Sequence, residues 1–152
     1  MHNRFTHGQR GFSLIEQLVA LVVVSVGMIG IAALYSQGLG AGRTALYRTQ
    51  AVNLAADMAD RIRVNRRGRA SYNGAGALSG CDPGGGVNCT PAQMAAHDVA
   101  VWQAQVAALL PGGVGTVTHL GTVPPTYTIQ VGWTEVGLVN PPHTIVIRVP
   151  PL

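Results

Sequence analysis

The sequence predicts an α+β protein in which one long N-terminal helix packs on a small antiparallel β-sheet, with a second helix at about residues 91–110. Three observations predict this fold. An apolar run fills residues 12–35, and an amphipathic helical pattern continues from it to about residue 65. A helix start signal stands near residue 90. Short segments with strand-like alternation follow residue 114.

The apolar run from Phe12 to Tyr35 is 24 residues long and carries one charge, Glu16. A helix of that length extends ~36 Å, which is enough to cross a bilayer core of ~30 Å. We therefore expect residues 12–35 to be embedded in a membrane. A lone carboxylate at the centre of a membrane helix costs about 2.5–3.5 kcal/mol, and less near an end, so Glu16 requires a partner. Gly27 and Gly30 fit either close helix packing or a soft point in the helix.

Residues 36–65 form the second, amphipathic half of the predicted helix. Apolar residues recur there at intervals of three or four, while charged residues lie off that stripe. The stripe consists of Ala51, Leu54, Ala55, Met58 and Ile62. We expect this stripe to pack on a globular head formed by residues 66–152, and we expect an ion pair between Asp57 and Arg61, one helical turn apart.

The arginines at the end of this helix form the one charge cluster of the chain: Arg61, Arg63, Arg66, Arg67 and Arg69. Such a cluster fits contact with DNA or an acidic partner. It also fits a solvated helix end, where cations are favoured by the helix dipole. We favour the solvated end, because no aromatic residue except Tyr72 lies near the arginines. Without Arg4 and Arg10, which precede the apolar run, eight arginines face six acids, and a net charge of +2 is too weak to indicate nucleic-acid binding. A nucleic-acid partner is therefore not expected.

Residues 68–90 are rich in Gly, Ser and Asn and read as a loop. Cys81 and Cys89 fit one disulfide, which is stable outside a reducing cytosol. A metal site would need further ligands at suitable spacing, and only His97 lies nearby, so no metal is expected.

Thr90 and Gln93 predict a capping box with Pro91 at the first helical position. The helix should end before the Pro-Gly-Gly segment at 111–113. Its apolar face is expected to contain four large side chains: Met94, Val101, Trp102 and Leu109.

Asp98 lies one turn from Trp102 on this helix. We expect its carboxylate to accept hydrogen bonds from neighbouring backbone or from the helix partner of Trp102. His97 and Asp98 should not form a catalytic pair, because adjacent helical residues point in different directions.

Three segments near the C-terminus alternate apolar and polar residues: 115–120, 127–134 and 144–149. Proline pairs at 124–125 and 141–142 punctuate them, as expected of strands joined by turns. The chain shows no nucleophile elbow, phosphate loop or zinc spacing. We therefore expect neither an enzyme nor a cofactor.

The segment Gly11-Phe12-Ser13-Leu14-Ile15-Glu16 resembles the processing site of type IV prepilins and pseudopilins. The resemblance implies that residues 1–11 are a leader, that a prepilin peptidase cuts after Gly11, and that Phe12 is then methylated. It also implies that Glu16 serves filament assembly. The alternative is an ordinary secretory signal peptide, but its apolar region would be ~7–15 residues long and be followed by an A-x-A-like site.

A second resemblance is to the PilV-type minor pilins, which start or modify type IV pili. It rests on residues 61–65, Tyr72, the two cysteines, Asp98 with Trp102, and residues 110–113. It implies a bacterial inner-membrane protein with a cytoplasmic N-terminus and a periplasmic head, which later enters the pilus. The implied partners are the prepilin peptidase, the lipid bilayer, the assembly platform of the inner membrane, other minor pilins and the major pilin. Two alternatives are a minor pseudopilin of a type II secretion system and a pilus-tip adhesion or DNA-binding module.

Overall fold

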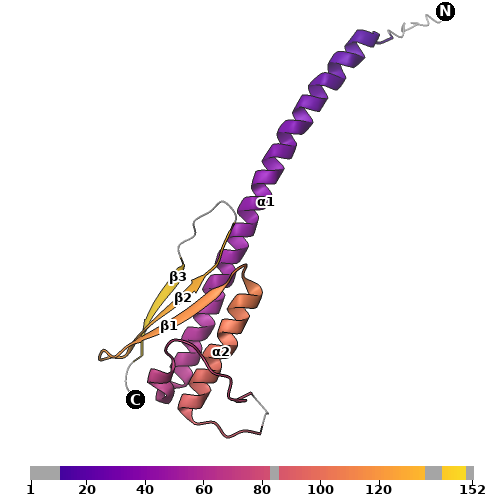
Figure 1. Ribbon diagram of the computed structural model, residues 1–152. Coiled ribbons are helices and arrows are strands. Elements are labelled where there is room, and N and C mark those ends of the chain that lie inside the picture. Colours follow the sequence, from indigo (N-terminus) through magenta and orange to yellow (C-terminus); the bar gives the residue numbers. More distant parts are fainter. Residues whose placement is uncertain (1–10, 83–85, 136–141, 150–152) are drawn as a thin grey trace, which may run out of the picture. The chain divides into compact units, whose positions relative to one another are not determined.

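The computed structural model describes residues 11–82, 86–135 and 142–149 (Figure 1). In chain order the elements are α1 (Leu14–Val64), the 3₁₀ helix η1 (Arg66–Ser71), α2 (Pro91–Leu109), β1 (Val114–Leu120), β2 (Thr126–Gly132) and β3 (His143–Arg148). The chain divides into two compact units, one up to Gly42 and one from Arg43 onward. The predicted α+β class is confirmed, with the long helix, the second helix and the antiparallel sheet all present.

The first unit holds the N-terminal part of α1. Its apolar side chains, from Phe12 to Leu39, are all exposed. Within the described residues, α1 is the one helix long and apolar enough to cross a membrane. A helix that is apolar and exposed on all sides is typical of a segment that is surrounded by lipid or by other apolar helices.

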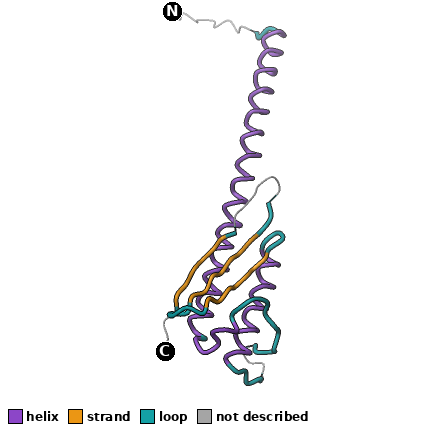
Figure 2. The backbone as a smooth tube through the Cα atoms, turned by 60° about the vertical axis from the view of Figure 1, so that its left-hand side comes forward, coloured by secondary structure: helices purple, strands orange, loops and turns teal. Residues whose placement is uncertain are grey.

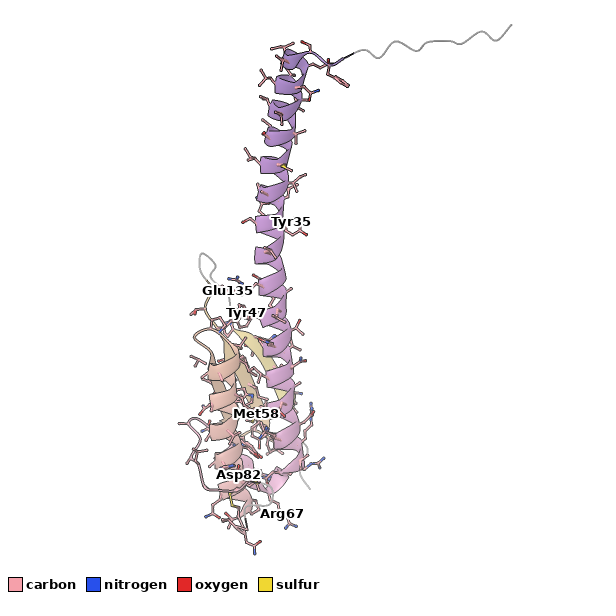
Figure 3. The ribbon with its side chains drawn as sticks, turned by 90° about the vertical axis from the view of Figure 1, so that its right-hand side faces the viewer. Tyr35, Tyr47, Met58, Arg67, Asp82 and Glu135 are labelled. Carbon is pink, nitrogen blue, oxygen red and sulfur yellow. A yellow bond between two sulfur atoms is a disulfide. The ribbon has the colours of Figure 1, made fainter. Side chains whose placement is uncertain are left out.

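In the second unit, α1 turns an apolar stripe toward the rest of the head. Its buried residues are Ala51, Leu54, Ala55, Met58, Ala59 and Ile62. The intervals of three and four residues place these side chains on one helical face, so the predicted stripe is confirmed. Figure 3 shows Met58 pointing from α1 into the head.

The sheet is three-stranded and antiparallel, in the order β1-β2-β3. Val117, Ile129 and Ile145 lie opposite one another across the three strands. Alternate residues of each strand face the helices, and they join the buried residues of α1 and α2 in one hydrophobic core. Figures 1 and 2 show α1 and α2 running side by side behind the sheet.

The start of α2 follows the predicted capping box. The Thr90 hydroxyl accepts a hydrogen bond from the backbone N–H of Gln93, and the Gln93 side chain accepts one from the backbone N–H of Thr90. Pro91 occupies the first turn. These bonds satisfy N–H groups that the helix leaves unpaired at its start, which is why α2 begins where the sequence predicts.

The expected apolar face of α2 was wrong in three of its four members. Trp102 is buried, but Met94 and Val101 are only half-buried and Leu109 is 52% exposed. The buried stripe is instead Ala95, Val99, Trp102 and Val106, with His97 beside it. Small residues allow close approach here, since a Cβ on Gly68 would lie 2.9 Å from the Cβ of Ala95.

Candidate functional site

The N-terminal segment before α1 is open to its surroundings. Phe12 is 77% exposed, and a Cβ placed on Gly11 would meet nothing within 4 Å. The first helical hydrogen bond that follows runs from the Gln17 N–H to the Ser13 carbonyl, with a length of 3.2 Å. The peptide bond between Gly11 and Phe12 therefore lies just outside the helix and is accessible.

Glu16 stands in the first turn of α1. A carboxylate at this end of a helix is favoured by the helix dipole. Its neighbours Leu14 and Ile15 are 86% and 66% exposed, and Glu16 itself makes no hydrogen bond or ion pair within residues 11–82, 86–135 and 142–149. The structure thus presents one acid, without a described partner, on a surface that carries no other charge from Phe12 to Tyr35.

Glu135 ties the segment after β2 to the start of α1 in the head. Its Oε2 accepts a hydrogen bond of 2.6 Å from the Thr44 hydroxyl, and its Oε1 accepts one of 2.7 Å from the Trp133 indole N–H. Figure 3 shows Glu135 near Tyr47 of α1. Sequence reasoning missed Glu135, because no local pattern connects it to a residue 91 positions earlier.

A polar cluster joins the end of α1 to η1 and α2. Arg61 donates from Nε to Asp57 at 2.9 Å and from Nη1 to Asp98 at 3.2 Å. The Tyr72 hydroxyl donates to the other oxygen of Asp98 at 2.7 Å. The ion pair predicted between Asp57 and Arg61 is confirmed.

Of the two alternatives expected for Asp98, one is confirmed and the other is wrong: the carboxylate accepts from Arg61 of α1, the helix to which Trp102 also bonds, and not from neighbouring backbone. Its carboxylate accepts from side chains 26 and 37 residues away, not from neighbouring backbone, because the fold brings Tyr72 and Arg61 to it. Burial raises the pKa of the Tyr72 phenol well above its usual range, and the hydrogen bond to Asp98 raises it further. Trp102 has a different partner, the Leu54 carbonyl, to which its indole N–H donates at 2.8 Å.

The predicted disulfide between Cys81 and Cys89 is present, with the two Cα atoms 5.9 Å apart. His97 of α2 holds the segment that leads into it. Its Nδ1 accepts a hydrogen bond of 3.2 Å from the Ser79 N–H, and its Nε2 lies 3.3 Å from a carboxylate oxygen of Asp82. His97 therefore has structural partners and points away from Asp98, as expected of adjacent helical residues.

Among the described residues, no three His, Cys, Asp or Glu side chains gather as a metal site would require.

Two protein families match this chain. Residues 6–32 match the prokaryotic N-terminal methylation motif, and residues 33–100 match the Tt1218-like family, described as type IV pilin Tt1218. The two matches meet without a gap and cover the N-terminal segment, all of α1 and the first half of α2.

The chain is a type IV pilin. Comparison with curated proteins and with solved structures gives no match. As a member of this family the pilin is a structural protein and not an enzyme. Its methylation motif implies processing by the prepilin peptidase, and its apolar N-terminal helix is consistent with a membrane location followed by incorporation into a pilus.

The pilin's arginine cluster is not brought together as one unpaired patch. Arg61 is engaged by Asp57 and Asp98, and Arg63 donates to Asp60 at 2.6 Å. The Arg66 guanidinium donates to the Arg63 carbonyl at 3.3 Å. Arg67 and Arg69 are exposed, and Figure 3 shows Arg67 at the end of the head where α1 stops.

Proposed function

We propose that this type IV pilin is a minor pilin of the PilV type, cut after Gly11, methylated on Phe12, and built into pili through Glu16. The observation that carries the proposal is Glu16 itself. It is the one charge in the 24 residues from Phe12 to Tyr35, and it has no partner within the described chain. We infer that its partner in the filament comes from another molecule.

Cleavage after Gly11 creates that partner, because it leaves a positively charged amine on Phe12. The amine of one subunit and Glu16 of its neighbour attract strongly in an apolar bundle, where the dielectric constant is low. Each charge left alone would be costly there, so pairing fixes the axial register of the subunits while Leu and Val side chains supply adhesion.

The organisation of the chain follows from this proposal. Residues 1–11 are the leader, residues 12–35 the membrane span and later the filament core, residues 36–65 the amphipathic half of the helix, and residues 66–152 the periplasmic head. Arg4 and Arg10 precede the apolar run, but Arg43 and Arg48 follow it, so the arginines alone do not orient the span. The cleavage motif favours a cytoplasmic N-terminus. The disulfide favours an oxidising compartment for the head.

The residues on which the resemblance to PilV-type minor pilins rests lie close together in the structure, and this supports the PilV-type assignment. Arg61, Tyr72 and Asp98 form the polar cluster that joins α1, η1 and α2. Trp102 lies one turn after Asp98 on α2, and its indole N–H donates a hydrogen bond to the Leu54 carbonyl of α1. Residues that are scattered in the sequence thus cooperate in one part of the head. The proposed partners are other minor pilins, the major pilin and the assembly platform of the inner membrane.

The test is the substitution Glu16→Ala, with Gln17→Ala as the matched control in the same helical turn. Mass spectrometry of membranes should show that both variants are inserted and cleaved. In sheared pili, Glu16→Ala should be depleted at least about tenfold, equivalent to ~1.4 kcal/mol, while Gln17→Ala should be retained. Equal incorporation of Glu16→Ala and the unsubstituted pilin would refute the pairing.

A strain that lacks the gene for this chain distinguishes a role in the type IV pilus from a role in a type II secretion system. The minor-pilin proposal expects fewer or altered pili, restored by the gene in trans, and unchanged secretion of folded exoproteins. Normal pili together with lost secretion would assign the chain to a type II secretion pseudopilus instead.

A further inference from the structure

The acids of the second compact unit, which begins at Arg43, all have partners within that unit. The chain has six acidic residues, and only Glu16 precedes this unit. The other five acids have these partners: Asp57 and Asp98 pair with Arg61, Asp60 pairs with Arg63, Asp82 lies beside His97, and Glu135 accepts hydrogen bonds from Thr44 and Trp133. Among the described residues, none of these acids forms an ion pair with Arg69.

Arg69 borders a recess at the end of the head where α1 stops. The recess has a volume of about 270 Å³ and is lined by Arg69, His119, Gly121, Thr122, Val123 and Pro125. Its walls come from η1, from the end of β1 and from the β1–β2 turn, which Figures 1 and 2 show at the same end of the sheet. Within the part of the chain that the structure describes, Arg69 makes no ion pair.

His119 forms one wall of this recess and has an unused ring nitrogen. Its imidazole stacks on Tyr127 of β2, with ring centroids 4.8 Å apart. Its Nε2 is buried and has no hydrogen-bond partner among the described residues. A buried polar atom left unpaired costs about 1–3 kcal/mol, so such atoms are rare and require an explanation.

The positive charge of Arg69 acts on Tyr127, whose ring contacts His119 in the wall of the recess. Burial raises the pKa of the Tyr127 phenol, while the positive charge of Arg69 acts in the opposite direction. A guanidinium in a partly enclosed site binds oxyanions through paired N–H groups. The recess is smaller than the ~300–1,000 Å³ typical of pockets for drug-sized ligands, so it suits one small group.

We propose that this recess binds a single oxyanion group, a phosphate or a carboxylate, with Arg69 supplying the charge. His119, Thr122, Val123 and Pro125 complete its lining, and the Thr122 hydroxyl is bonded within the turn to the Pro124 carbonyl at 2.9 Å, so Arg69 is the cation among the lining residues. The ligand is thus one anionic unit and not the backbone of a nucleic-acid duplex, which would contact a broad surface. This site is independent of whether the chain is a minor or a major subunit.

The experiment uses the full chain in detergent micelles, titrated with sodium phosphate and separately with sodium acetate at constant ionic strength. Amide and side-chain NMR signals of Arg69, His119 and Thr122 should shift and saturate with at least one of the two anions. Arg69→Gln should weaken this binding at least tenfold, whereas the matched control Arg67→Gln should leave it unchanged. The anion that binds more tightly identifies the ligand class.

Two results would overturn the proposal. One is the absence of saturable shifts in the unsubstituted chain with both anions, which does not depend on how any variant folds. The other is equal weakening by Arg67→Gln and Arg69→Gln, with short duplex DNA binding as well as phosphate. That pattern would mean diffuse attraction by the arginines and not a built site.

Discussion

Trp102 is the largest fully buried side chain among the described residues. It is fully buried, its indole N–H is bonded to the Leu54 carbonyl, and Gly115 of β1 faces its ring. A Cβ on Gly115 would lie 2.5 Å from the nearest ring carbon. Because the indole is fixed by its hydrogen bond, it has little freedom to move aside.

Gly115→Ala should therefore destabilise the head. Overpacking of a well-filled core costs about 1–3 kcal/mol, and we expect a loss of that size in the free energy of unfolding measured with urea. Gly121→Ala is the control, because a Cβ there meets nothing within 4 Å and should change the stability little. Equal stabilities of the two variants would show that the Trp102 ring is not held as described.

Tyr72 should make the stability of the head depend on alkaline pH. Its pKa in the folded chain lies above the usual value of about 10, chiefly through burial, so the folded state holds the phenol proton more tightly than the unfolded state. The resulting stabilisation is fully present below about pH 10 and is lost as the pH rises toward the folded pKa. Urea unfolding at successive pH values should show this fall, and Tyr72→Phe should show a shallower one. An identical slope in both proteins would contradict the burial of the hydroxyl against Asp98.

At the scale of single elements, α1 is one helix with two different surfaces. Its first part is apolar and exposed on all sides, whereas its second part buries a single stripe. Both patterns are local, as is the capping box of α2, and strand alternation is local too. For this reason α1, the start of α2 and the three strands were predictable from the sequence.

Tertiary contacts decided what the sequence did not predict. The partners of Asp98, the buried face of α2 and the role of Glu135 all depend on residues far away in the chain. Ala95 is buried in place of Met94 because Gly68 lets η1 come close, which periodicity alone does not reveal. Arg61 and Arg63 pair with acids, so the five arginines do not form one unpaired basic patch.

The N-terminal cap of α2 gives a prediction at this scale. Thr90→Ala removes the hydroxyl that accepts from the Gln93 N–H and should cost about 1 kcal/mol of stability. Thr49→Ala is a control of opposite sign, since the Thr49 hydroxyl bonds the Ala45 carbonyl on the exposed surface of α1 and Ala is the better helix former. Thermal or urea unfolding should rank the Thr49 variant above the unsubstituted chain and the Thr90 variant below it. The opposite ranking would count against the capping box.

At the scale of the whole molecule, the chain joins a folded head to an apolar helix whose one acid lacks a described partner. The head satisfies its own charges, with the exception of arginines such as Arg69. The apolar helix does not satisfy Glu16, so the two parts differ in what they require from other molecules. The described acids of the head have partners in the same chain, whereas we propose that the apolar helix takes a lipid or protein environment and a cationic partner from other molecules.

The most direct test of this account is mass spectrometry of the chain recovered from purified native pili. We predict a mature polypeptide that begins at Phe12 and carries one methyl group on its amine, so that the cation proposed to face Glu16 exists in the filament. Functional pili containing the chain with residues 1–11 still attached would contradict the account, because the amine would then lie outside the apolar bundle.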